Sequence, residues 1–140
     1  MGNVFSSFET IQFKELQSLI ETDILLLNTL SHEHQSYLIY GTLCASKETD
    51  QMNFYLKNNR SIEIILYGKD HLDRSMIEKY NQLKQLGFSR IRIYFGGLFE
   101  WALLQDIYGP TLFKTHGTVK DPLDVFYLNK KNWFEIIAYR

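Results

Sequence analysis

The stretch SIEIILYGKDHLDRSMIEKYNQLKQLGFSRIRIYFGGLFEW, residues 61–101, decides the fold of this chain. Its apolar start, residues 62–67, predicts a buried strand, and the polar residues 68–74 predict a loop. A helix is expected from Ser75, because apolar side chains then recur at helical spacing: Met76, Tyr80, Leu83 and Leu86. Gly87 is expected to end that helix.

The rest of the chain extends this pattern into an α/β fold. Short strands are expected at residues 91–94 and 24–27, the latter from an apolar run typical of a strand buried on both faces. A further short strand is expected at 10–13, and helices are expected at residues 14–21, 46–58 and 98–108. We therefore predict a single domain with a parallel sheet of about five strands and helices on both faces.

The loop at residues 68–74 lies where ligands bind in open parallel sheets. The first turn of a helix leaves about four backbone N–H groups unpaired, and a loop that curls over them can hold an anion. Arg74 is placed to add a bidentate donor, and Ser75 is expected to cap the helix, with Glu78 completing a capping box. We predict an anion-binding loop made of Gly68, Lys69, Asp70, His71, Leu72, Asp73, Arg74 and Ser75. Two alternatives stay open: a plain connection capped by Ser75, and a loop closed by an ion pair between Lys69 and Asp73.

Length and composition narrow the class of protein. The chain has 140 residues, enough for one domain, and is 45% hydrophobic and 15% aromatic. Its net charge is −1 and its basic residues do not cluster, which disfavours nucleic-acid binding. The single cysteine, Cys44, excludes an intrachain disulfide and a cysteine-based metal motif, so we expect a reducing, cytoplasmic setting. No apolar run approaches the ~20 residues that span a bilayer, and the N-terminus lacks the features of a signal peptide.

The N-terminus carries a lipidation motif. Residues 1–7, MGNVFSS, fit the N-myristoylation pattern, with Gly2 as acceptor and Ser6 at the favoured position. One myristoyl chain gives only marginal membrane binding, with an association constant of roughly 10⁴ per molar, and no second signal lies beside it. We therefore expect a weak, peripheral membrane association that needs a partner, an assembly or an exposed apolar surface to persist.

The stretch at residues 61–101 resembles the second half of a rhodanese domain. The family has a strand ending in a catalytic Cys, a loop closing with Arg and Ser or Thr, a helix, an LGF segment, a strand, and GG before an aromatic and a Trp. Here Leu86-Gly87-Phe88, Gly96-Gly97 and Trp101 follow in that order, and Arg74-Ser75 closes the loop. The resemblance covers about residues 8–108 and implies a rhodanese-like fold at residues 9–108, after a tail at 1–8 and before a C-terminal extension at 109–140.

The family's nucleophile position is Gly68 in this chain. Arg74 follows it by six positions, a loop length that resembles the rhodanese-fold phosphatases rather than the sulfurtransferases. Both chemistries need a thiolate, which glycine cannot supply. The family's DVR and GHIPGA motifs are also degenerate here, at residues 28–30 and 37–42. The resemblance therefore implies a catalytically inactive binding module, with no catalytic residue, no cofactor and a protein or phosphorylated ligand as partner.

Two other chemistries remain as alternatives. Cys44 is a candidate non-standard nucleophile for a phosphatase or sulfurtransferase, although a small buried cysteine is the simpler interpretation. His32 and His34 flank Glu33 in a pattern that metal sites can use, but no third and fourth ligand stands at a recognised spacing and His116 is remote. We interpret these histidines as solvated and predict no metal site.

The C-terminal residues 109–140 are additional to the resemblance. They carry Phe126, Tyr127, Trp133 and Phe134, which must pack on the domain or dock on another molecule. The lipidation motif, the missing Cys and the GGLFEWALLQDIYG segment also resemble rhodanese-like proteins of large DNA viruses of protists. That resemblance implies a virus factory or virion, and a third possible function as a virion structural protein docking through its C-terminal tail.

Overall fold

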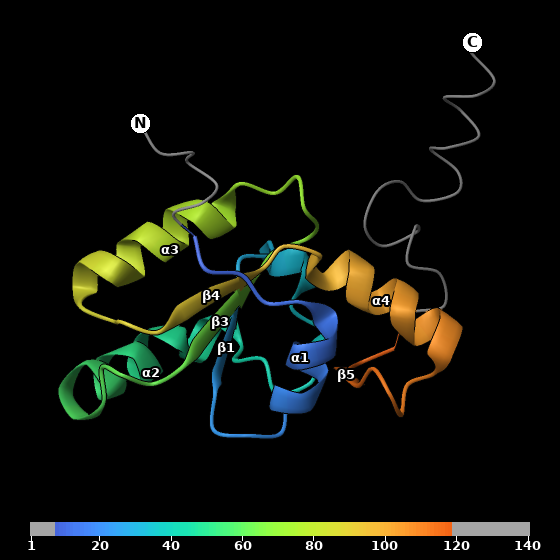
Figure 1. The fold of residues 1–140 in the computed structure, drawn as a ribbon, viewed down its shortest axis with the longest axis horizontal. Helices are drawn as coiled ribbons and strands as arrows, with labels where there is room; N and C mark the ends of the chain where they lie inside the picture. The colour runs from blue at the N-terminus through green and yellow to red at the C-terminus, as the bar shows by residue number, and fades with distance from the viewer. Residues whose placement is uncertain (1–7, 119–140) are drawn as a thin grey trace, which may run out of the picture.

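The computed structural model describes residues 8–118 (Figure 1), so Gly2 with its motif and residues 119–140 lie outside the described part of the chain. Its centre is a parallel sheet of three strands in the order β1-β3-β4. The strands are β1 (Leu25–Asn28), β3 (Ile64–Tyr67) and β4 (Ile91–Tyr94). Nearly every side chain of these strands is buried, as expected for a sheet covered on both faces.

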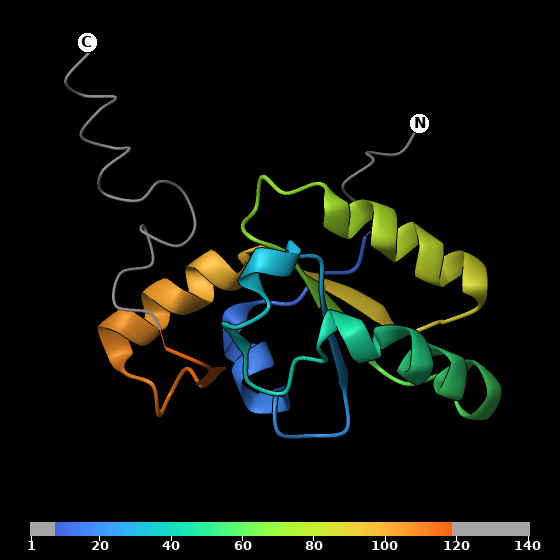
Figure 2. The ribbon, with the colours of Figure 1, turned by 180° about the vertical axis from the view of Figure 1, so that it is seen from behind.

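Helices cover both faces of the sheet, as predicted (Figures 1 and 2). On one face, α1 (Phe13–Leu19) and α4 (Gly97–Tyr108) pack on the strands through Leu16, Leu98 and Trp101. On the other face, α2 (Ala45–Asn58) and α3 (Ser75–Leu86) pack through their own apolar residues: Met52, Met76, Tyr80 and Leu83. The α/β architecture inferred from the apolar patterns is therefore confirmed.

The prediction of about five strands was wrong, because the outer two segments pair through one residue each. Thr10 forms a single parallel bridge with Ile93 at one edge, and Thr42 forms another with Leu26 at the opposite edge. The predicted strand at residues 10–13 cannot extend, because Phe13 already begins α1. At the other edge, the chain enters α2 at Ala45, three residues after the bridge.

A small antiparallel pair lies beside the main sheet. β2 (Leu38–Ile39) pairs with β5 (Thr115–His116), and the short 3₁₀ helix η2 (His32–His34) precedes β2. Between α4 and β5, Phe113 is buried in the core and its ring meets that of Trp101 at a centroid distance of 5.1 Å. Within the predicted extension, Phe113 and β5 therefore pack against the domain.

Glycines end both α3 and α4. Gly87 follows α3 with φ of +109°, and its N–H donates to the Lys84 carbonyl, so the predicted helix end is confirmed. Gly109, with φ of +100°, ends α4. Within residues 8–118, no helix combines the length and the apolar character that crossing a bilayer requires.

Candidate functional site

The candidate site lies where the carboxyl ends of β1 and β3 meet. Tyr67 ends β3 and Gly68 follows it, while Thr29 follows the last residue of the neighbouring β1. Residues 68–74 then form the loop that leads into α3. Because parallel strands bring their carboxyl ends to one edge, Thr29 and the loop come together although they are distant in sequence.

The centre of the loop is occupied by the side chain of Asp73. Its Oδ2 accepts a hydrogen bond from the Lys69 backbone N–H at 3.2 Å. Its Oδ1 accepts from the Ser75 backbone N–H at 3.0 Å and from the Ser75 hydroxyl at 2.6 Å. The Ser75 hydroxyl is also 2.7 Å from Thr29 Oγ1. The loop's own carboxylate thus takes the donors that an external anion would use.

The same carboxylate lies against Gly68. A Cβ atom placed on Gly68 would be 2.6 Å from Asp73 Oδ2 and 2.9 Å from Thr29 Oγ1, both inside van der Waals contact. Any side chain at this position therefore requires the Asp73 carboxylate to move. The nucleophile position of the resembling family and the Asp73 conformation exclude one another.

Asp73 is held in its charged form. Partial burial alone would raise the pKa of this carboxyl, but the hydrogen bonds from Ser75 and Lys69 and the Lys69 charge outweigh burial and lower the pKa below its usual value. Of the alternative closure by Lys69 and Asp73, the structure shows a hydrogen bond from the Lys69 backbone N–H to Asp73 and an effect of the Lys69 charge on the Asp73 pKa.

The remaining predicted loop residues divide into an inner and an outer set. Asp70 is buried and its Oδ1 accepts from the Leu72 backbone N–H at 2.9 Å, while its carbonyl accepts from the Asp73 N–H at 3.2 Å. This turn leaves His71, Leu72 and Arg74 at the exposed tip. Anion binding by the loop at residues 68–75 stays a prediction.

The prediction that Ser75 caps α3 was wrong. The helix begins at Ser75 itself, Arg74 takes the N-cap position, and no side chain of Arg74 caps the helix. The first helical amide is instead satisfied by Asp73, two residues earlier. An Asp before a helix is a common solution to the same need, because its carboxylate favours the positive end of the helix dipole.

A second connection, between β4 and α4, packs directly on the loop. The backbone N–H groups of Leu98 and Phe99 donate to the carbonyls of Gly68 and Lys69, each at 2.9 Å. Gly97 has φ of +70°, and a Cβ there would be 2.7 Å from the Gly68 oxygen. Glycine is therefore needed at position 97, because α4 begins in backbone contact with the loop.

Glu100 is a site residue that no sequence pattern singled out. Tyr94 donates its hydroxyl to Glu100 Oε1 at 2.6 Å, and burial together with this carboxylate raises the pKa of Tyr94 far above its usual value. A Cβ on Gly96 would be 2.5 Å from the same oxygen. The sequence analysis also did not single out Thr29 as a site residue. Its position directly after a buried strand could have placed it at the carboxyl edge of the sheet, beside the loop.

The other candidate residues lie outside the loop. Cys44 is exposed and directly precedes α2, so the expectation that it is buried was wrong. Gln35 holds this region by accepting from the Ala45 N–H and donating to Asn28 Oδ1 at 2.8 Å. His34 Nδ1 lies 3.2 Å from the Ser31 hydroxyl. Among residues 8–118, no three His, Cys, Asp or Glu side chains gather as a metal site requires.

Comparison with solved structures identifies the fold. No protein-family model matches the chain, and no curated protein matches it. The crystal structure of the Alr3790 protein from Anabaena sp. is similar at 22% identity and a TM-score of 0.55, covering 78% of this chain and 93% of that one. The solution NMR structure of the rhodanese-like domain of Alr3790 is similar at 21% identity and a TM-score of 0.54, covering 80% and 81%. At these identities the likeness concerns the fold alone, and the chain has a rhodanese-like fold.

Proposed function

We propose that this chain is a catalytically inactive rhodanese-like binding module. The observation that carries the proposal is the contact between Gly68 and Asp73. Glycine has no atom that can attack a substrate, and the Asp73 carboxylate lies 2.6 Å from the place where a Cβ would be. The position of a nucleophile and the space beside it are therefore both lost.

The charge of Asp73 supports the same proposal. Two unit charges of like sign 4 Å apart repel by about 4 kcal/mol at an effective dielectric constant of 20. Sulfur-transfer and phosphoryl-transfer substrates are anionic, so an ionised carboxylate on the loop amides opposes their binding. The residual anion site that we predict around Arg74 would open only when Asp73 leaves the loop centre.

Activity measurements on a matched set of variants test this proposal. We would assay thiosulfate sulfurtransferase and phosphatase turnover in the natural protein, in Gly68→Cys, and in Gly68→Cys with Asp73→Ala. We expect no turnover in the natural protein, because it has no nucleophile. We expect none in Gly68→Cys alone, because Asp73 crowds the new side chain, and measurable turnover in the double variant.

Turnover in the natural protein would overturn the proposal. If Cys44→Ser then abolished that turnover, the enzymatic alternative with a non-standard nucleophile would replace it. The exposed position of Cys44 makes this control necessary.

We further propose that Gly2 is myristoylated and that the module works at a membrane with a protein partner. The support is the motif at residues 1–7, and the viral resemblance would set that membrane in a virus factory or virion. Labelling with an alkynyl myristate in eukaryotic cells should mark the protein, and Gly2→Ala should abolish the label. Label that survives Gly2→Ala would contradict lipidation without affecting the case for the loop.

A further inference from the structure

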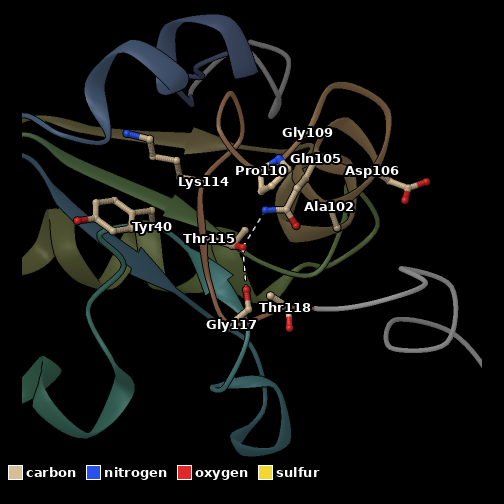
Figure 3. Close-up of a pocket in the computed structure, with 10 residues that line it drawn as sticks. All are labelled: Tyr40, Ala102, Gln105, Asp106, Gly109, Pro110, Lys114, Thr115, Gly117 and Thr118. Carbon is tan, nitrogen blue, oxygen red and sulfur yellow. Dashed lines mark hydrogen bonds between the residues drawn. The ribbon is translucent and has the colours of Figure 1, made fainter.

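A groove of about 600 Å³ runs between α4 and the segment that leads into β5 (Figure 3). Ala102, Gln105 and Gly109 line it from the side of α4, and Tyr40 and Thr115 line it from the opposite side. Its floor is fixed by hydrogen bonds, because Gln105 Nε2 donates to Thr115 Oγ1 at 2.9 Å and this hydroxyl donates to the Gly117 carbonyl at 3.0 Å. The groove is therefore a built part of the fold.

Two exposed apolar side chains, Leu103 and Ile107, lie on α4, the helix that lines one side of the groove. Leu103 and Ile107 lie one helical turn apart and each follows a groove-lining residue, Ala102 or Asp106, by one position. Leu103 is 36% exposed and Ile107 is 68% exposed. Two large apolar side chains one turn apart make a small apolar surface on this helix. Leu103 and Ile107 are therefore candidates for contact with another part of the chain.

Residues 119–140 of the same chain are a suitable occupant of the groove. Thr118, the last described residue, lines the groove, so the following residues start there. Residues 119–140 contain five aromatic residues with the bulk to fill a groove of this kind: Phe126, Tyr127, Trp133, Phe134 and Tyr139. The segment also carries a positive charge at Lys120, two positions after Thr118, and Asp106 lines the groove, whereas the amino group of Lys114 is paired with Glu21.

We propose that residues 119–140 fold back and dock on the groove and on the Leu103–Ile107 strip of α4. A tethered segment has an effective concentration of about millimolar, so weak contacts suffice where a separate partner would need many more. Twenty-two extended residues reach roughly 70 Å, so distance does not limit the contact. This surface is separate from the Asp73 loop, and the proposal stands independently of catalysis and of lipidation.

The two tryptophans allow a direct test. Trp101 is buried in the core, and Trp133 is the only other tryptophan in the chain. We would measure acrylamide quenching of tryptophan fluorescence in the full chain and in Trp133→Phe, which isolates Trp101. A docked segment shields Trp133, so the full chain should be quenched little more than Trp133→Phe. Strong quenching of the full chain, as for free tryptophan, would overturn the proposal.

Paired surface variants locate the contact. Ile107→Asp should raise the quenching constant about twofold or more, because it places a charge on the docking strip. Phe54→Asp on α2, where the side chain is 54% exposed, is the matched control and should change nothing. An equal rise in both variants, or in neither, would contradict docking on α4.

Two further controls exclude other outcomes. Leu103→Ser gives a milder second variant if circular dichroism shows that Ile107→Asp has lost its fold. Shielding of Trp133 that disappears on dilution would assign the strip to a second copy of the chain and overturn the intrachain contact.

Discussion

The connections that follow β3 and β4 both pack a carboxylate against a glycine, but the two carboxylates have different hydrogen-bond donors. Each places a carboxylate against a glycine at the end of a strand: Asp73 against Gly68, and Glu100 against Gly96. Asp73 is satisfied by backbone amides of the loop and of α3, whereas Glu100 accepts the hydroxyl of buried Tyr94. The first arrangement uses up the anion-binding groups of a helix N-terminus, and the second fixes a side chain of the sheet. Identical contacts at glycine therefore have different consequences for ligand binding.

The largest effect is expected where the two connections touch. Gly97→Ala would force a Cβ to 2.7 Å from the Gly68 oxygen at a φ of +70°, which combines backbone strain with a backbone clash. We expect the free energy of unfolding in urea to fall by about 3 kcal/mol or more. Gly109→Ala is the matched control, because its φ is +100° and no atom lies within 4 Å of the new Cβ. It should cost about 1–2 kcal/mol from strain alone, and equal losses would refute the role given to the contact.

Removing the loop carboxylate should have the next largest effect. Asp73→Ala deletes three hydrogen bonds, and losses of such helix-end partners cost about 1–2 kcal/mol. The same variant should gain binding of inorganic phosphate, measured by ³¹P titration, because Lys69 and Ser75 amides become available. Phosphate binding by the natural protein as tight as by Asp73→Ala would show that the loop is open after all.

The stabilising effect of Asp73 should depend on pH in acid. Its pKa in the folded protein lies below the unfolded value of about 3.9. The ionised carboxylate therefore stabilises the fold fully above that value, and the contribution is lost as pH falls through the folded pKa. The unfolding free energies of the natural protein and Asp73→Asn should converge below about pH 4. If the difference in unfolding free energy between the two proteins stayed constant across the acid range, the stabilisation by Asp73 would come from its shape rather than its charge.

The Tyr94–Glu100 hydrogen bond of the second connection should tolerate change better than the Asp73 carboxylate of the loop. Tyr94→Phe removes one hydrogen bond to Glu100 and should lower the unfolding free energy by about 1 kcal/mol. Because burial and Glu100 raise the pKa of Tyr94 well above that of an exposed tyrosine, its hydroxyl should not ionise near pH 10. The amplitude of tyrosinate absorbance near that pH should thus be the same in the variant. A smaller amplitude in Tyr94→Phe would mean that Tyr94 titrates normally.

The smallest effect is expected at the tip of the loop. His71 is exposed, and surface substitutions of this kind usually change stability by less than about 0.5 kcal/mol. His71→Ala should leave both the urea midpoint and phosphate binding by Asp73→Ala unchanged. A clear loss of binding would give His71 a role in the anion site that its position outside the loop centre does not indicate.

Strong apolar periodicity explains why most elements were predictable. Met76, Tyr80 and Leu83 are buried on α3 as their spacing implies, and Gly87 ends the helix as its conformational freedom predicts. The strand count failed because Thr10 and Thr42 contribute single bridges, and apolar pattern carries no information on how far a ladder extends. The packing of Phe113 on Trp101 could not be predicted from apolar periodicity, because the contact joins a residue of α4 to the segment that follows it.

The site was only partly predictable for a related reason. The position of Gly68 at the end of a strand follows from chain order, and the sequence therefore located the loop correctly. Which way Asp73 turns depends on amides within the loop and on Ser75, whose hydroxyl reaches Thr29 across 46 positions. Local sequence patterns describe spacing along one element and cannot encode such a convergence.

The fit between Gly68 and Asp73 also bears on how this chain can evolve. With Asp73 in the loop, a single mutation that places a cysteine at position 68 puts its Cβ 2.6 Å from a carboxylate oxygen. With glycine at 68, a mutation that removes Asp73 weakens the loop and gains no nucleophile. Under the proposed function, a cysteine at position 68 with free space beside it therefore requires two changes, and each single change is unfavourable by itself.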